Sequence, residues 1–167
     1  PFIEVSNKPM ILQAINDLPK AEIKKVILRK DIIDFKNSGI KNSFSNFSFQ
    51  FTNNITDGQA ATCLIGMDDI DKNSPLLISA CDNGAIYNNN KFIDIINDTG
   101  IDIVVWGCRG FPGSLKNPNM YGWIEQENNI VKKIYVKEIY KDPQVDPIIT
   151  ETFFFKKASI FKIIAKD

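Results

Sequence analysis

The segment Pro75–Asn83 constrains the fold more than any other stretch, because it has the pattern of a buried strand that stops at a carboxylate. Apolar and small residues run from the proline to Asp82, and Asn83-Gly84 then breaks the strand. Asp82 is therefore expected at the carboxyl end of a strand, which is the edge of an open α/β sheet where ligands bind. The alternative is an ordinary turn, since Asp-Asn-Gly is a good turn former.

Strands and helices alternate along the first two thirds of the chain. The expected strands cover residues 24–28, 44–51, 75–82 and 102–106, and the expected helices cover residues 11–18, 32–37, 56–67 and 91–98. This alternation favours βαβ units with right-handed crossovers. We therefore predict an α/β fold, a Rossmann-like three-layer α/β/α arrangement around a mostly parallel central sheet.

The alternation of strands and helices ends after Trp106. Residues 107–119 are rich in glycine and proline and are expected to form a loop. Two strands, 121–125 and 130–137, are expected around a polar turn, followed by a loop at 141–147, a strand at 152–155 and a helix at 156–166.

Composition limits the classes of function. A chain of 167 residues with 44% hydrophobic side chains is long enough for one globular domain. Twenty basic and twenty acidic residues balance, so charge gives no argument for nucleic acid or an acidic membrane as a partner. There is no histidine, and the three cysteines are widely spaced, which excludes a Ser-His-Asp triad and a zinc site of the usual ligands. No apolar run is long enough to span a membrane, and we expect a cytoplasmic protein.

Two further patterns are compatible with binding of a phosphorylated ligand. The stretch Thr56–Thr62 has a glycine turn opening a helix, and such helix starts favour phosphate or a base edge, although an ordinary capped helix has the same pattern. The pair Lys137-Glu138 follows a strand and, with Asp82, would suit a divalent metal and a phosphorylated ligand. The same pair would also suit a solvated strand end.

The order of these motifs resembles the nucleoside-triphosphate transferase family, the sugar-1-phosphate nucleotidyltransferases. The resemblance rests on Pro1–Val5 with Lys8–Ile11, then Asp57–Ala60, Leu76–Asp82, Tyr121–Trp123 and Tyr135–Glu138, and it covers nearly the whole chain. It implies transfer of a nucleoside monophosphate from a nucleoside triphosphate to a sugar 1-phosphate, or a similar small phosphate, with release of pyrophosphate. The products would be precursors of surface polysaccharides.

The resemblance also implies roles for individual residues. By position, Gly58 and Gln59 would contact the nucleotide base, and Asp82 would bind the catalytic Mg²⁺. Magnesium takes one or two carboxylates plus substrate phosphates, so one strand-end aspartate is a sufficient protein anchor. Catalysis would then be mainly positioning and charge neutralisation.

The sugar-phosphate pocket would lie further along the chain. By the same resemblance, Tyr121 and Gly122 would line it through backbone groups, Glu138 would bind sugar hydroxyls, and Lys137 would assist with phosphate. The implied partners are a nucleoside triphosphate and a sugar 1-phosphate, with no nucleic acid and no membrane, while a homo-oligomer is left open.

Several positions depart from the family pattern. The chain begins at Pro1 without the glycine-rich loop that carries the family's strongest signature, so we expect residues 1–167 to be a single-domain fragment without its upstream strand and phosphate loop, inactive alone. The second metal-binding aspartate of the family would lie beyond Asp167. Glu151 stands where the family often has a small residue, so it either points away from the pocket or alters substrate choice, and Cys81 stands where glycine is common.

Two other classes of function remain. A non-catalytic regulator would bind a nucleotide or sugar phosphate in the same crevice. A structural or interaction domain would use the Phe-rich strand from Phe44 to Phe51 to pair with another chain.

Overall fold

The structure is a computed structural model, and it describes residues 2–31, 44 and 46–166. The chain divides into two compact units, each assembled from segments far apart in the sequence. The first unit comprises Pro1–Ile15, Leu77–Ala85 and Ile103–Phe154, and the second comprises Asn16–Leu76, Ile86–Asp102 and Phe155–Asp167. In the described part of the chain, no helix is long and apolar enough to cross a membrane.

A small hairpin and a helix begin the first unit. Strands β1 (Glu4–Val5) and β2 (Lys8–Pro9) are antiparallel, and α1 (Met10–Asn16) follows at once. The two residues that join the strands, Ser6 and Asn7, have φ of 52° and 62°, as a two-residue hairpin turn requires. The sequence predicted the helix but not the hairpin.

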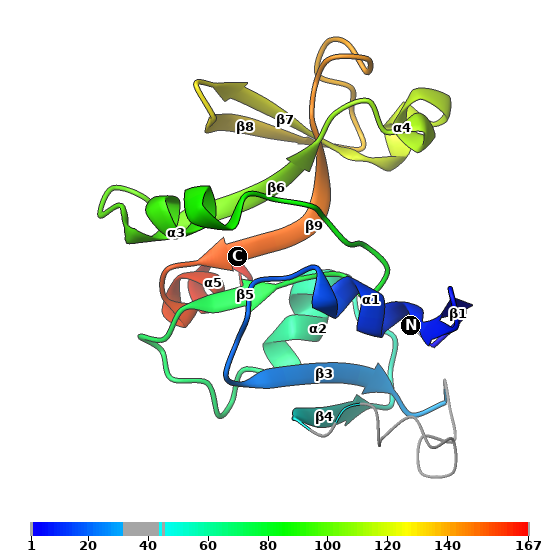
Figure 1. Ribbon diagram of the computed structural model, residues 1–167, viewed down its shortest axis with the longest axis vertical. Coiled ribbons are helices and arrows are strands. Elements are labelled where there is room, and N and C mark those ends of the chain that lie inside the picture. The colour runs from blue at the N-terminus through cyan, green and yellow to red at the C-terminus, as the bar shows by residue number, and fades with distance from the viewer. Residues whose placement is uncertain (1, 32–43, 45, 167) are drawn as a thin grey trace. The chain divides into compact units, whose positions relative to one another are not determined.

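The five-stranded sheet lies almost entirely in the first unit. Its strands are β5 (Leu76–Ile78), β6 (Ile103–Cys108), β7 (Gly122–Glu127), β8 (Ile130–Val136) and β9 (Ile148–Phe155). The order is β5-β9-β7-β8, and β6 also pairs with β9. In Figure 1, β6 and β9 run side by side with their arrowheads at opposite ends.

The prediction of a mostly parallel sheet is therefore wrong, since this largest sheet is antiparallel. The physical reason lies in β9, which pairs with three other strands and runs against its neighbours. β7 and β8 are joined by a two-residue turn, Asn128-Asn129 at φ 51° and 64°, which is possible only between antiparallel strands. The mixed α/β class is confirmed, and the strand direction is not.

Trp123 forms the centre of this unit's core. It is completely buried, and its Nε1 donates a hydrogen bond of 2.9 Å to the Pro118 carbonyl. Pro118 begins a 3-10 helix, η2 (Pro118–Met120), which follows α4 (Pro112–Lys116). The expected loop over residues 107–119 thus contains two short helices, each begun by a proline, because proline suits the first turn of a helix.

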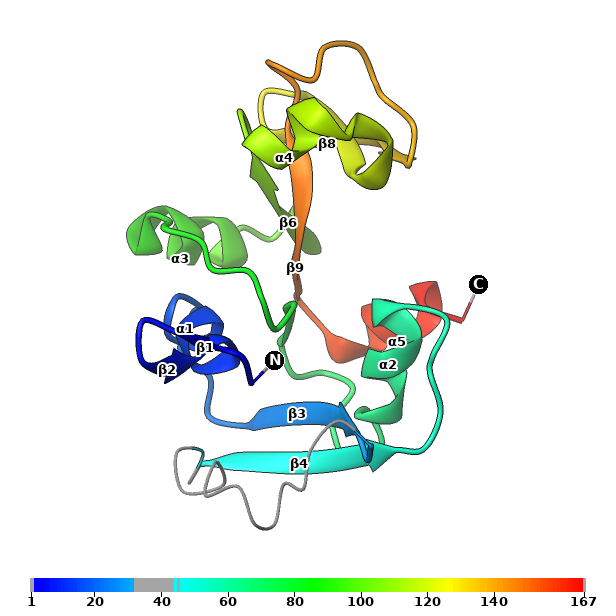
Figure 2. The same ribbon diagram turned by 90° about the vertical axis from the view of Figure 1, so that its right-hand side faces the viewer.

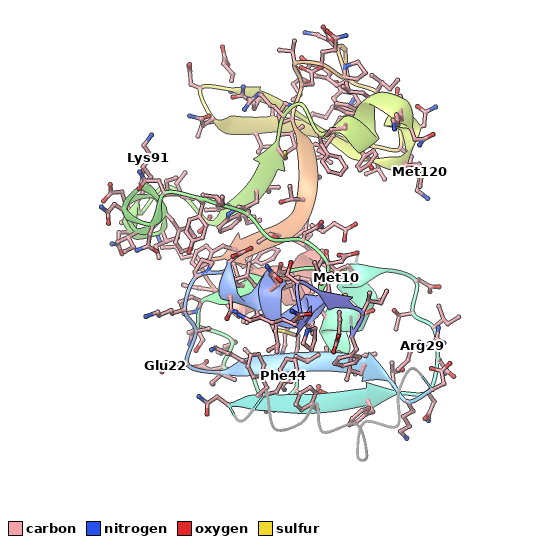
Figure 3. All side chains as sticks on the ribbon, turned by 45° about the vertical axis from the view of Figure 1, so that its right-hand side comes forward. Met10, Glu22, Arg29, Phe44, Lys91 and Met120 are labelled. Atoms are coloured by element: carbon pink, nitrogen blue, oxygen red, sulfur yellow. The ribbon has the colours of Figure 1, made fainter. Side chains whose placement is uncertain are left out.

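The second unit contains a parallel pair, β3 (Lys24–Arg29) and β4 (Phe47–Thr52), drawn side by side with arrowheads in the same direction in Figure 2. Phe44 is 2% exposed and packs edge-on against Phe47 and Phe49, at ring distances of 5.2 and 5.6 Å. Figure 3 shows the labelled Phe44 against this strand pair. Phe44 therefore covers part of the phenylalanine face of the predicted strand, while Phe47 and Phe49 are half-buried and Phe51 is exposed.

In the described part of the second unit, three helices follow: α2 (Gln59–Ile65), α3 (Asn89–Asn97) and α5 (Ala158–Ile164). Side chains of the strand pair fix the end of α2, because Gln50 Nε2 donates to the Ile65 carbonyl at 2.8 Å and Lys25 Nζ donates to the Gly66 carbonyl at 2.9 Å. In α3, Phe92 is buried, whereas Ile95 is exposed. The helix expected at residues 32–37 lies outside the described residues.

Candidate functional site

Asp82 lies in a bend and not at the end of a strand. β5 ends at Ile78, so Asp82 lies four residues beyond it, and its side chain is exposed. The expectation that the strand extends to Asp82 is therefore wrong. After Ile78 the contact with β9 passes to a side chain, because the Ser79 hydroxyl lies 3.0 Å from the Thr152 hydroxyl.

The bend is nevertheless held against β9. The Asn83 side-chain amide donates to the Thr150 carbonyl at 3.2 Å. Together with the Ser79–Thr152 contact, this bond holds residues 79–83 to both chain neighbours of Glu151 on β9. The Cys81–Asp82 bend therefore lies opposite Glu151. Residues 79–83 continue along β9 through side chains where the backbone pairing stops.

Glu151 has a conformation that is unusual for glutamate. Its φ is 56°, in the left-handed region, although it lies in the middle of a strand and its side chain is exposed. Burial is the main cause that raises the pKa of the Cys81 thiol, and the carboxylates of Asp82 and Glu151 raise it further. Asp82 and Glu151 therefore act on the same thiol, so Glu151 does add negative charge near Asp82.

Tyr121 and Gly122 come together with Lys137 at one end of the β7–β8 hairpin. Gly122 is the first residue of β7 and pairs with Val136, the last residue of β8. The Lys137 amide donates to the Tyr121 carbonyl at 3.2 Å. A side chain at position 122 would begin 3.2 Å from Ile149 Cδ1, so glycine allows β7 to approach β9 closely here.

The Tyr121 side chain is placed by the segment before it. Its ring meets the Phe111 ring edge-on at 5.9 Å, and its hydroxyl lies over Gly113, where a Cβ would be only 2.5 Å away. Lys137 and Glu138 are both exposed, and Lys137 has φ of 56°. The hairpin thus presents one basic and one acidic side chain directly beside the Tyr121-Gly122 backbone.

Gly58 and Gln59 lie in the second unit. The predicted glycine turn is confirmed: Gly58 precedes α2 with φ 135° and ψ −175°, a backbone conformation that is essentially restricted to glycine. Its carbonyl accepts hydrogen bonds from the Thr62 amide at 3.1 Å and from the Thr62 hydroxyl at 2.9 Å. The role of Gly58 and Gln59 in contacting a base stays a prediction.

A cluster of charged and aromatic side chains lies beside Lys137 and Glu138, and sequence reasoning missed it. Tyr135 and Tyr140 stack at 5.0 Å with an angle of 25° between their rings, and the Tyr135 hydroxyl donates to Glu125 Oε2 at 2.9 Å. Lys133 Nζ lies 4.4 Å from the centre of the Tyr135 ring, and Lys141 Nζ lies 4.6 Å from that of Tyr140. These distances permit cation–π attraction.

The electrostatics of this cluster follow from its hydrogen bonds. Hydroxyl donors, Tyr135 first and Tyr140 second, hold the pKa of Glu125 below its ordinary value. The same bond to Glu125 is the largest cause that raises the pKa of Tyr135. A register shift between Glu125 and Gln126 pairs Glu125 with Lys133 and places it diagonally from Tyr135 on one face of the hairpin. The two-residue turn is the sequence signal for the hairpin, but its register alone would pair Glu125 with Lys132, so it did not predict this contact.

The described residues offer few ligands for a metal ion. Among them, no group of three or more His, Cys, Asp or Glu side chains could hold a metal ion. Asp82 nevertheless offers an exposed carboxylate, a hard oxygen donor of the kind Mg²⁺ prefers. The residues therefore fit a magnesium ion only if substrate phosphates and water supply most of its ligands.

Comparison with known proteins places the fold. No protein-family model matches the sequence, and no curated protein matches it either. Solved structures do match. A protein from Bacillus anthracis described as a glucose-1-phosphate thymidylyltransferase, solved in complex with a sucrose, matches with a TM-score of 0.69 at 18% identity, over 98% of this chain and 64% of its own.

Two further solved structures match the fold of this chain. An apo UDP-glucose pyrophosphorylase matches with a TM-score of 0.66 at 14% identity, over 99% of this chain and 71% of its own. HddC from Yersinia pseudotuberculosis matches with a TM-score of 0.59 at 18% identity, over 99% of this chain and 69% of its own. The chain thus spans about two thirds of the length of the proteins it resembles. Over nearly its whole length, it has the fold of sugar-1-phosphate nucleotidyltransferases.

Proposed function

We propose that this chain is the nucleotide- and sugar-phosphate-binding part of a nucleotidyltransferase. The reaction would move a nucleoside monophosphate from a nucleoside triphosphate to a sugar 1-phosphate, or a similar small phosphate, and release pyrophosphate. The products would serve as precursors of surface polysaccharides. The observation that carries the proposal is the match in fold over 98% of the chain to the thymidylyltransferase structure.

The geometry of the hairpin supports the acceptor side of the proposal. Tyr121, Gly122 and Lys137 are joined by backbone pairing, and Glu138 follows directly. In the proposed complex the backbone of Tyr121-Gly122 lines the sugar-phosphate pocket, and the Glu138 carboxylate accepts hydrogen bonds from sugar hydroxyls. The Lys137 ammonium offsets phosphate charge, which is a usual role of lysine as a compact cation.

The nucleotide side rests on Gly58 and Gln59. Gly58 has the backbone conformation that only glycine adopts easily, so the chain can approach a flat ligand without a side chain between them. In the proposed complex Gly58 and Gln59 contact the base of the nucleotide. Asp82 would hold Mg²⁺ through its carboxylate, and the ion, when bound, would neutralise charge on the reacting phosphates.

The experiment that tests this proposal is a pair of titrations followed by NMR. Glucose 1-phosphate should shift the amide signals of Tyr121, Gly122, Lys137 and Glu138. A nucleoside triphosphate, drawn from a panel of the four common bases plus dTTP, should shift those of Gly58 and Gln59. If neither ligand class shifts its own set of signals, the proposal is refuted.

Turnover is measured separately. If the proposal is right, the active protein releases pyrophosphate from a nucleoside triphosphate when a sugar 1-phosphate is added. Binding of both ligands without release would favour the alternative function, a non-catalytic regulator that binds a nucleotide or sugar phosphate.

The magnesium assignment has its own variant. In active protein, Asp82→Asn should remove most magnesium-dependent activity with little effect on folding, because the side chain is exposed and its loss opens no cavity. Asp94→Asn, which changes an exposed aspartate on α3, is the matched control. Equal activity of the two variants would remove Asp82 from the metal site.

A further inference from the structure

The loop that carries Lys137 and Glu138 is fastened at its first residue. β8 ends at Val136, and the next residue, Lys137, turns the chain with φ of 56°. The Lys137 amide donates to the Tyr121 carbonyl at 3.2 Å. This bond holds the beginning of the loop against the residue that precedes β7.

The same loop is fastened again two residues after Glu138. Tyr140 folds back onto Tyr135 of β8, with ring centres 5.0 Å apart and planes 25° from parallel. The Tyr135 hydroxyl donates a hydrogen bond of 2.9 Å to the Glu125 carboxylate on β7, and the Tyr140 hydroxyl also lowers the pKa of that carboxylate. Lys141 Nζ lies 4.6 Å from the centre of the Tyr140 ring.

These contacts close a small ring of chain around Lys137 and Glu138. One end is held by a backbone hydrogen bond and the other by an aromatic stack, while the two side chains between them stay exposed. An exposed side chain on a loop fixed at both ends loses less conformational entropy when it binds a ligand, and this lowers the cost of binding.

We propose that Glu125, Tyr135 and Tyr140 are positioning residues that hold Lys137 and Glu138 in the geometry that receives the acceptor phosphate. The binding of the acceptor phosphate by this loop rests on the proposed function. The contacts that fix the two ends of the loop do not depend on it. The Tyr140 ring is the main element, because its stack on Tyr135 ties the far end of the loop to β8. The Glu125 carboxylate holds the Tyr135 ring, on which Tyr140 stacks, by accepting the hydrogen bond from the Tyr135 hydroxyl.

The alternative is that the stack only stabilises the hairpin. The two roles differ in what a Tyr140 variant changes. A purely stabilising stack would alter all β7–β8 amides together and leave affinity for the acceptor unchanged in folded protein. A positioning stack alters the Lys137 amide and the affinity, while the β7–β8 pairing remains.

The test is amide hydrogen exchange by NMR on the whole chain in the wild type, Tyr140→Ala and Tyr140→Phe. We expect the protection of the Lys137 amide to fall about 3- to 10-fold in Tyr140→Ala, the range implied by the loss of one aromatic pair. Tyr140→Phe keeps the ring and should recover most of the protection. Tyr87→Ala, which removes a tyrosine packed on Phe92 in the other unit, is the matched control and should leave the Lys137 amide unchanged.

A calorimetric titration with glucose 1-phosphate adds the functional readout. We expect Tyr140→Ala to bind about 3- to 10-fold more weakly than Tyr140→Phe. Unchanged protection of the Lys137 amide in Tyr140→Ala, or an equal fall across all β7–β8 amides, would overturn the proposal. If the wild type binds no sugar phosphate, the proposed function and the acceptor role fail, and the exchange data alone decide whether the stack fastens the loop.

Discussion

Glu151 offers a direct measurement of backbone strain in β9. Its φ of 56° places a residue with a Cβ in the left-handed region in the middle of a strand. That conformation costs about 1–2 kcal/mol for an ordinary L-residue. Glycine avoids this cost but loses about 0.5–1 kcal/mol more than alanine in backbone entropy on folding.

The comparison that isolates the strain is Glu151→Gly against Glu151→Ala, because both variants lose the carboxylate and its contacts and only the alanine keeps a Cβ. At the midpoints of the two ranges, the difference favours the glycine variant by about 0.75 kcal/mol in unfolding free energy. For a chain of this size, that difference corresponds to a melting temperature higher by roughly 1–4 °C. Urea unfolding followed by circular dichroism, with a thermal scan, measures both quantities.

The charge of the Glu151 carboxylate is measured separately, through the pKa of the Cys81 thiol. Both variants should lower the pKa of the Cys81 thiol by the same amount, because each removes one nearby negative charge, while burial, the larger cause, remains. Titration of the thiol by its ultraviolet absorbance measures this shift. A Glu151→Gly variant no more stable than Glu151→Ala would refute the reasoning about the backbone.

Three further predictions concern other positions. Gly58→Ala should destabilise the chain by about 1–3 kcal/mol, because φ of 135° with ψ of −175° is essentially restricted to glycine, whereas Gly100→Ala should cost less in the same urea experiment. Burial raises the pKa of Cys63 from 9.0 to about 11, so iodoacetamide at pH 8 should label it about 100-fold more slowly than an unperturbed thiol, and rapid labelling read by mass spectrometry would contradict this. The lowered pKa of Glu125 contributes stability that is present above its ordinary value of 4.5 and is lost as the pH falls below it. Unfolding curves of Glu125→Gln should therefore depend less on pH in that acidic range than those of the wild type, and parallel dependence would count against the bond to Tyr135.

Local patterns in the sequence predicted the elements whose cause is local. The hairpin of β7 and β8 follows from alternating residues around a polar turn, and the glycine before α2 follows from helix-start chemistry. The order of motifs also predicted the fold that the solved structures share. For the hairpin and the glycine turn, the residues that determine the structure are neighbours in the chain.

The antiparallel direction of the strands in the largest sheet could not be predicted from local patterns. It depends on β9, whose partners β5, β6 and β7 come from distant segments, and no local pattern states which strands will meet. The early end of β5 has the same origin, because Ser79 contacts Thr152 through its hydroxyl and leaves Asp82 in a bend. The stack of Tyr140 on Tyr135 likewise needs the fold of the loop between them.

The place of β9 also affects how the chain folds during synthesis. β5 leaves the ribosome long before β9, since Ile78 and Phe155 are separated by 77 positions (155 minus 78). At about 5–20 residues per second, the earlier strand waits roughly 4–15 s for its partner. During that interval the β7–β8 hairpin can form alone, whereas β5 and β6 expose unpaired edges. Chaperone binding to nascent chains should therefore peak before residue 148 emerges and fall once β9 is available.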